Sequence, residues 1–314
     1  MQYLIRVTNH ELQINHQFQK LRFPHSAYKK TNGVFSFIPT KRTMPKLTLP
    51  LLLIFSIFLF FTCKDKDNSK CNEDLITAKG IDYYPLEIGK YITYELDSII
   101  YSRIVCTCNE NCTYPFRRDT SNTQLREEVV DVFEDNLGDK NFVIERYFRK
   151  DASEPWKIKD VWNTKITDTR VERVEENLRF IKMVFPVSNT VTWSGNNFFQ
   201  DTSIVIGNEV VEFYQHWTSE YTYENIDQSE EINGIAFDSV MTVVQSNQTE
   251  NKSHHRVATE KYARGVGMIF KEMLILDTNC CIDLSSDLGD CENLPWELKG
   301  EQGMILRQRI VDFN

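Results

Sequence analysis

From Lys90 onwards the chain repeats short segments in which apolar and polar side chains alternate with a period of two residues. The first of these segments runs from Lys90 to Tyr101. Its Ile92, Tyr94 and Leu96 fall on one face of an extended chain, with polar residues between them. This alternation, rich in β-branched and aromatic residues, is the pattern of a half-buried β-strand. Apart from the ambiguous stretch 209–217, no segment has a helical period over three turns, so an all-β fold is expected.

The same pattern predicts further strands at Gln124–Glu134, Lys140–Lys150, Pro155–Lys165, Arg170–Val174, Leu178–Val187, Ser203–Ile206, Val210–Glu224, Ile235–Ser246, His254–Ala263, Val266–Asp277 and Met304–Phe313. Roughly ten short strands with short connections favour an antiparallel architecture. We therefore expect a single large curved sheet, either a half-barrel or an open barrel, with a β-sandwich as the second choice. In the segment 140–150, Phe142, Ile144 and Phe148 share a face that Arg146 interrupts.

A different pattern precedes the strands, from Met44 to Cys63. It has a basic start at Lys46, an apolar middle at 47–61 and a small residue, Thr62, before the cysteine. These are the three parts of a secretory signal. The apolar block is 15 residues long and contains Pro50, whereas a membrane span needs about 20 residues. The sequence therefore favours a cleaved signal over an uncleaved anchor.

Phe60-Phe61-Thr62-Cys63 resembles a lipobox, the site where a lipoprotein signal peptidase cuts and where the new N-terminal cysteine receives acyl chains. Its Phe in place of the usual Leu, and the charged Lys64-Asp65-Lys66-Asp67 that follows, are similar to lipoproteins of the Bacteroidetes. Three further segments look like recurring segments of such lipoproteins: Tyr84–Tyr94, Trp193–Asn196 and Tyr262–Glu272. The resemblance implies acylation of Cys63 and attachment to the outer membrane, on its periplasmic or surface side. It implies no catalytic residues.

We expect these features to divide the chain into an N-terminal extension (1–43, disordered), a signal peptide (44–62), a flexible tether (63–80) and a single β-rich domain (81–314). A start codon assigned too early is the preferred explanation of the extension, and a long basic leader is the alternative. Removal of residues 1–62 leaves 28 basic and 44 acidic residues, a net charge of −16. Such a surface repels nucleic acid and anionic lipid, so neither is expected as a partner.

The cysteines other than Cys63 are expected to form disulfides, because an exported protein folds in an oxidising compartment. Six of them form two triplets: Cys106, Cys108 and Cys112, then Cys280, Cys281 and Cys291. Adjacent cysteines hardly bridge each other, so at least one bridge should join the triplets and clamp the loops 102–120 and 278–292 together. The spacing does not match paired zinc ligands, and neither a metal nor a cofactor is expected. Cys71 is the odd one, either free or paired between molecules.

No catalytic constellation is evident in the sequence. Adjacent glutamates such as Glu127-Glu128 point to opposite faces of a strand and cannot work as an acid–base pair. The aromatic residues Trp156, Trp162, Trp217, Tyr221 and Tyr223 form either sheet core or a groove for a lipid, glycan or protein ligand. The preferred function is a non-enzymatic binding or assembly lipoprotein. The alternative is a surface-displayed hydrolase in which His216 or His254 meets a carboxylate across strands.

Overall fold

The computed structural model describes residues 75–103, 116–199, 204–206, 209–211, 216–217, 220–278 and 294–314. The chain separates into two compact units, Met1–Asn68 and Ser69–Asn314, and every described residue belongs to the second. No helix in these ranges is long and apolar enough to span a bilayer.

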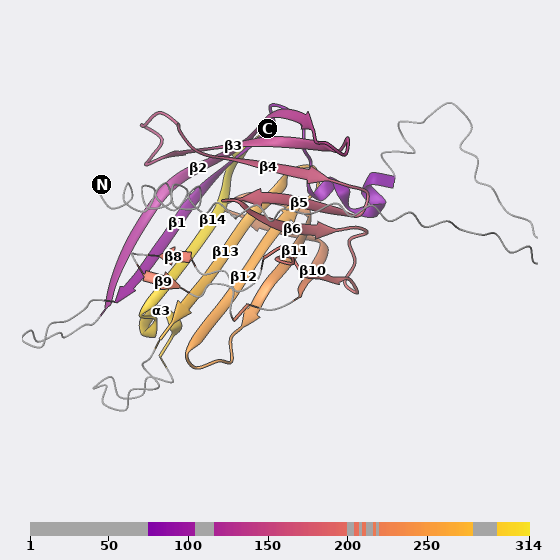
Figure 1. The fold of residues 1–314 in the computed structure, drawn as a ribbon. Helices are drawn as coiled ribbons and strands as arrows, with labels where there is room; N and C mark the ends of the chain where they lie inside the picture. Colours follow the sequence, from indigo (N-terminus) through magenta and orange to yellow (C-terminus); the bar gives the residue numbers. More distant parts are fainter. Residues whose placement is uncertain are drawn as a thin grey trace, which may run out of the picture. The chain divides into compact units, whose positions relative to one another are not determined.

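Twelve strands form one antiparallel sheet in the order β6-β5-β4-β3-β2-β1-β14-β13-β12-β11-β10-β7, and β8 and β9 form a separate pair (Figure 1). The strands are β1 (Tyr91–Arg103), β2 (Phe116–Glu134), β3 (Lys140–Arg149), β4 (Lys157–Ile166), β5 (Arg170–Glu175), β6 (Leu178–Val184), β7 (Thr192–Trp193), β8 (Ile204–Ile206), β9 (Glu209–Val211), β10 (Tyr221–Ile232), β11 (Ile235–Gln248), β12 (His254–Ala263), β13 (Gly267–Asp277) and β14 (Gln302–Phe313). Two short helices, η1 (Ile81–Tyr83) and α3 (Trp296–Lys299), and a helical turn at 75–79 complete the described chain.

The sheet confirms the expected all-β architecture and its single curved antiparallel sheet. Strand β10 shows where the pattern misleads. The predicted segment 210–224 corresponds to two strands, β9 and β10, and β10 continues beyond it to Ile232. The sequence did not predict this continuation, because most residues after Tyr223 are exposed and polar and so show no alternation of apolar and polar side chains. Asn225 and Asp227 adopt positive φ angles of 51° and 57°, and the register with β11 shifts beside them. The two-residue strand β7 is too short to leave any periodic signal.

The two ends of the sheet meet, so that the sheet nearly closes into a barrel. The backbone N–H of Ile181 in β6 donates to the carbonyl of Gly195, just beyond β7, at 2.7 Å. The indole N–H of Trp193 donates to the Ile181 carbonyl at 2.8 Å. The Tyr223 hydroxyl accepts from the N–H of Val184 at 2.8 Å and donates to its carbonyl at 2.7 Å. Side chains thus satisfy backbone groups that a neighbouring strand would otherwise bond.

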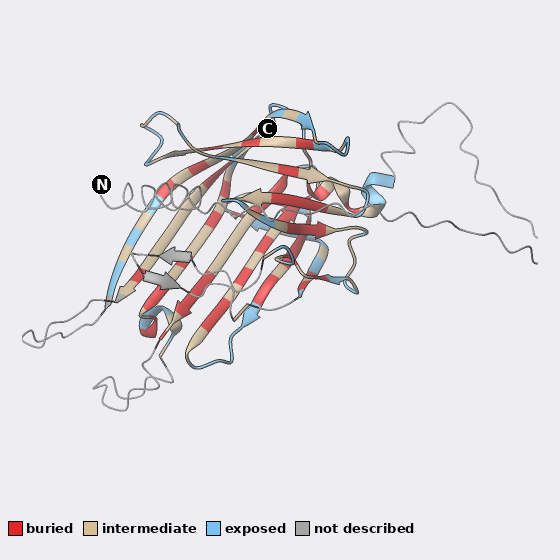
Figure 2. Cartoon of the chain, viewed as in Figure 1, coloured by how far each residue is buried: buried red, intermediate tan, exposed pale blue. Residues whose placement is uncertain are grey.

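The concave face of the sheet carries the main core. Buried positions recur along the strands, as the red bands in Figure 2 show. In β12 the inward positions are Arg256, Ala258, Glu260 and Tyr262, each at most 1% exposed. The core therefore contains charged side chains at positions where a β-core usually holds apolar ones.

All the cysteines lie outside the described residues, and the disulfide clamp therefore stays a prediction. The described strand ends beside the two cysteine loops do lie at one end of the sheet. Tyr101, at the end of β1, pairs with Gly303 in β14, and the next β14 residue outwards, Gln302, pairs with Asp277 at the end of β13.

Candidate functional site

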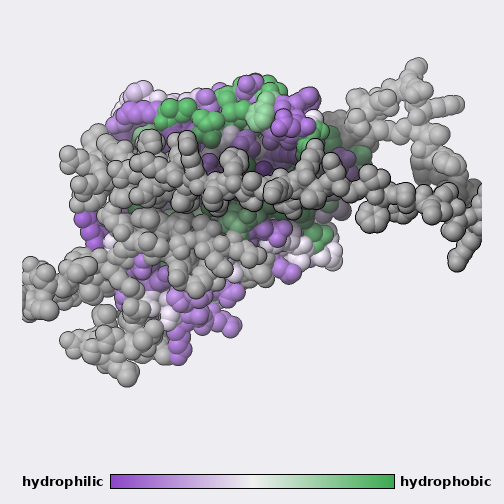
Figure 3. Space-filling view, viewed as in Figure 1, coloured by the Kyte–Doolittle hydropathy of each residue, from purple (hydrophilic) through white to green (hydrophobic). Residues whose placement is uncertain are grey.

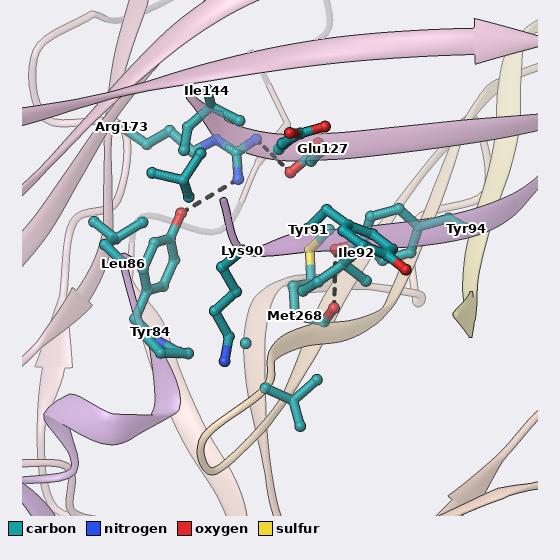
Figure 4. Close-up of a pocket in the computed structure, with 15 residues that line it drawn as sticks. Tyr84, Leu86, Lys90, Tyr91, Ile92, Tyr94, Glu127, Ile144, Arg173 and Met268 are labelled. Atoms are coloured by element: carbon teal, nitrogen blue, oxygen red, sulfur yellow. Dashed lines mark hydrogen bonds and ion pairs between the residues drawn. The ribbon is translucent and has the colours of Figure 1, made fainter. Parts of the chain in front are cut away.

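A pocket opens at the end of the barrel where the described chain begins (Figure 4). It is small, with a cavity volume of about 60 Å³, and is partly open to solvent. It is lined by Tyr84, Pro85, Leu86, Lys90, Tyr91, Ile92, Tyr94, Glu127, Glu128, Val129, Ile144, Arg173, Val266, Gly267 and Met268. These residues come from the segment before β1, from β1, β2, β3, β5 and β13, and from the β12–β13 turn.

The walls of the pocket are mainly apolar. Tyr94 donates from its hydroxyl to the Met268 carbonyl at 2.9 Å, which fixes the start of β13 against β1. Gly267 has a φ angle of 108°, and a Cβ there would lie 3.3 Å from Cδ1 of Ile92. A glycine is therefore what lets the two strands approach at this wall. At the mouth, the Lys90 ammonium donates to the Gly265 carbonyl at 2.7 Å.

The floor of the pocket is polar and already ion-paired. The Arg173 guanidinium contacts Glu127 at 2.7 Å and the Tyr84 hydroxyl at 3.2 Å, as the dashed lines in Figure 4 show. Glu127 also accepts from Arg146 at 3.1 Å. Burial works to raise the pKa of Glu127, but the guanidinium groups of Arg173 and Arg146 outweigh it and lower the pKa below its ordinary value. The carboxylate at the floor is therefore ionised at neutral pH.

The floor belongs to a larger set of ion pairs inside the barrel, which we call the interior ion chain. In order, its members alternate in sign: Asp160, Arg146, Glu127, Arg173, Glu175, Lys182, Glu260 and Lys271. The successive N···O distances run from 2.6 to 3.5 Å. Four cations and four anions balance within the chain, as buried charges require.

The carboxylates of the interior ion chain are poorly suited to general acid–base catalysis. Burial tends to raise the pKa of Glu260, but the ammonium groups of Lys182 and Lys271 dominate and hold it at about 2. The pKa of Glu175 is lowered by Lys182 and Lys271 in the same way, against the opposing effect of burial. A general acid that works near neutral pH needs a raised carboxyl pKa, and the pKa values of Glu127, Glu175 and Glu260 are lowered. Across the described ranges, no cluster of three metal-ligating side chains is found.

The five aromatic residues predicted for a groove lie in different surroundings. Trp162 faces the Arg146 and Arg173 guanidinium carbons, 3.6 and 4.6 Å from its ring centroid. Trp156 lies between Arg126 and Arg149, at 5.1 and 4.2 Å.

The other three predicted residues, Trp217, Tyr221 and Tyr223, lie away from Trp156 and Trp162. Tyr221 and Tyr223 are buried against Trp193, with ring centroids 5.8 and 4.6 Å from it. Trp217 packs beside Ile275 on the concave face. None of the five lines the pocket of Figure 4.

The histidines of the hydrolase alternative do lie together. Nδ1 of His254 is 3.0 Å from Asp277, and the His216 ring stacks on His254 with centroids 3.8 Å apart. Asp277 is also 2.7 Å from the guanidinium of Arg256, which is fully buried. The carboxylate thus holds a buried cation as well as orienting an imidazole. An oriented imidazole becomes a hydrolase site only beside a nucleophile, which this contact does not supply.

The residues that sequence reasoning missed are the members of the interior ion chain. A charged residue in an alternating strand is normally assigned to the solvent face, yet Glu175, Lys182 and Glu260 face inwards. One signal of these inward charges was visible in the sequence, where Arg146 interrupts an apolar strand face. In the structure Arg146 pairs with both Glu127 and Asp160 in the interior ion chain. The expected acylation site, Cys63, lies outside the described residues.

Comparison with known proteins finds no matching family model and no matching curated protein. Two crystal structures are similar. One is a candidate exported protein with a YmcC-like fold from Bacteroides fragilis, with 12% identity, a TM-score of 0.34 and coverage of 74% of this chain and 98% of the other. The second is a candidate lipoprotein from Parabacteroides distasonis, with 9% identity, a TM-score of 0.32 and the same two coverages. At these scores neither likeness carries an argument about function.

Proposed function

We propose that this chain is a lipid-anchored lipoprotein of the bacterial outer membrane, on its periplasmic or surface side, and that it acts as a non-enzymatic binding module. The lipobox-like Phe60–Cys63 and the charged segment after it support the anchoring. Several acyl chains on one cysteine give durable attachment where a single chain is marginal.

The pocket at the end of the barrel is the observation that supports binding. Its apolar walls suit the hydrophobic part of a small amphiphilic ligand. Tyr84 accepts a hydrogen bond from Arg173, which leaves its own hydroxyl proton to donate to a ligand acceptor. Lys90 supplies further donors at the mouth, since its ammonium has three N–H groups and one meets Gly265. The ligand class that fits is a small molecule, or a terminal group of a lipid or peptide, with an apolar end and a hydrogen-bond acceptor.

The pre-paired floor supports binding over catalysis. Arg173 and Glu127 neutralise each other and orient each other, so they can hold a polar group without taking or giving a proton. Asp277 pairs with buried Arg256 as well as with His254, so this carboxylate also serves to hold a buried cation, and the described residues favour binding over the hydrolase alternative.

The test is extraction of the native, membrane-derived protein and mass spectrometry of the small molecules that copurify with it. Val266→Trp fills the pocket mouth with a larger ring, and Ile158→Trp places the same ring on an exposed position of β4 that does not line the pocket. We expect one molecular species to accompany the unsubstituted chain and the Ile158 variant, and to be depleted at least tenfold from the Val266 variant. Equal amounts in all three samples would place the ligand elsewhere, and no bound species in any of them would remove the support for a binding function.

A further inference from the structure

One end of the barrel collects the loops that surround the pocket. These are the segment 84–90 before β1, the β2–β3 turn at 135–139, the segment 185–191 after β6 and the β12–β13 turn at 264–266, and together we call them the tether-end rim. The antiparallel register places all of them at the same end of their strands. The helical turn at 75–79 is fixed to this rim, because the Lys79 carbonyl accepts from the N–H of Val187 at 3.0 Å and the Thr77 carbonyl accepts from Arg264 at 3.0 Å.

Large hydrophobic side chains are exposed at this rim. Ile88 and Leu137 lie in the rim itself, Phe133 lies at the end of β2 beside it, and Leu75 and Ile76 lie in the helical turn fixed to it. Leu137 is 84% exposed at the tip of the β2–β3 hairpin, and Ile88 is 60% exposed in the loop before β1. Figure 3 shows a further hydrophobic area along the upper edge of the face in view, where Figure 1 places β2 to β4; of these strands, β4 carries exposed Ile158 and Val161, which lie outside the rim. Hairpin tips are usually polar, so a largely exposed leucine at one is unusual, and Ile88 is exposed at the same end of the barrel.

The length of chain before the described part indicates which partner is within reach. Leu75 follows the expected acylation site, Cys63, by 12 residues, which span at most about 40 Å when fully extended. A domain held that close to a bilayer meets it at a high effective concentration. The described chain starts at the rim that carries the exposed hydrophobic side chains. The net charge of −16 in the mature chain opposes contact with anionic lipid, so the surface that fits is neutral phospholipid.

We infer that the tether-end rim docks on the bilayer that holds the acyl chains of Cys63, with Leu137 and Ile88 inserted among neutral phospholipid head groups. The inference rests on the lipid anchoring proposed above. Docking sets the barrel with its pocket towards the membrane and its far end, which carries α3, away from it. A ligand that reaches the pocket would then come from the lipid surface.

Tryptophan reporters test this orientation. The full lipidated protein is reconstituted into phosphatidylcholine vesicles whose acyl chains carry bromine, a short-range quencher of tryptophan fluorescence. Leu137→Trp places a reporter on the rim. The matched control is Leu298→Trp, which replaces another exposed leucine, 51% exposed on α3 at the far end of the barrel. Both substitutions are at exposed positions and leave the core intact, and the unsubstituted chain provides the background from its own tryptophans.

We expect brominated lipid to reduce the additional fluorescence of the Leu137 variant by at least half and to leave that of the Leu298 variant unchanged. Equal quenching of the two reporters, or none in either, would overturn the docking. Flotation of the same vesicles distinguishes failure of the anchoring from failure of the docking. Protein that floats but shows no quenching at position 137 is anchored without being docked by this rim. Protein that does not float refutes both the anchoring and the docking. Neither readout depends on whether the pocket binds a ligand.

Discussion

At the scale of single residues, the interior ion chain is the feature in which this β-core differs most from an ordinary one. Glu260 is fully buried, and its carboxylate contacts Lys182 at 2.6 Å and Lys271 at 3.3 Å. The Tyr262 hydroxyl also donates to it at 2.6 Å. Such a group is tolerated inside a protein only while its partners are present, because a buried charge left alone has lost its hydration without compensation.

Glu260→Gln should therefore destabilise the fold strongly. The substitution keeps the size of the side chain but leaves two ammonium groups short of a counter-charge, and removal of one partner of a buried pair costs about 3–5 kcal/mol. Glu230→Gln is the matched control, since Glu230 pairs with Lys261 near the surface and such pairs contribute about 0–1 kcal/mol. The measurement is the free energy of unfolding in urea. Similar values for both variants would show that burial does not set the cost.

The lowered carboxyl pKa values predict the response to acid. Glu260 has a folded-state pKa of about 2 against an ordinary value of 4.5, and the pKa of Glu175 is lowered as well. When the pH falls below about 4.5 the unfolded chain binds protons before the folded chain does, so stability falls as the pH drops towards 2. For Glu260 alone the loss is about 3 kcal/mol.

Urea unfolding at pH 7, pH 4 and pH 2.5 checks this response. The free energy of unfolding should be greatest at neutral pH and should decrease through the acid range, and the Glu260→Gln variant should lose less over the same interval. An unfolding free energy that stays constant down to pH 2.5 would contradict the ionised state of these carboxylates.

At the scale of strands and turns, the closure between β6 and β7 determines whether the sheet is a barrel or an open sheet. Gly195 is central to it, because its carbonyl accepts from Ile181 and a Cβ at this position would lie 2.0 Å from Cε2 of Tyr221. Tyr221 is itself 1% exposed and packs on Trp193. Only a glycine lets the chain pass this ring.

Gly195→Ala should open the closure. The added methyl group overlaps a buried ring, and overpacking of this kind costs about 1–3 kcal/mol or more. Gly138→Ala is the control, since Gly138 has a φ angle of 82° but no atom lies within 4 Å of an added Cβ, so only the backbone cost of about 1 kcal/mol applies. Hydrogen exchange of the Ile181 amide should accelerate in the first variant and not in the second. Unchanged exchange at Ile181 in both variants would contradict this role of Gly195.

Most strands could be predicted from the sequence because burial of one strand face makes apolar and polar side chains alternate. Strands without that alternation were missed or predicted only in part. Strand β12 was predicted with its observed bounds, His254–Ala263, because one face is buried and the other is not. Strand β10 was predicted only in part, since its polar residues beyond Tyr223 pair with β11 through the backbone and leave no side-chain pattern. The pocket could not be predicted at all, because it joins residues from the chain before β1, from five strands and from the β12–β13 turn.

At the scale of the whole molecule, the described chain begins at the barrel end that carries the pocket and the exposed rim. Tyr84 and Lys90, which line the pocket, lie about 20–30 residues after the expected acylation site at Cys63. The proposed anchor therefore lies a short length of chain before the barrel end that carries both the pocket and the docking surface. The anchor is the premise on which the location of the protein depends.

Intact-mass spectrometry of the protein isolated from its native membrane tests that premise most directly. The account predicts a chain that begins at Cys63, lacks residues 1–62 and carries fatty acyl groups on its first residue. A mass that still includes the first 62 residues, or a chain that begins at Cys63 without acyl groups, would contradict it.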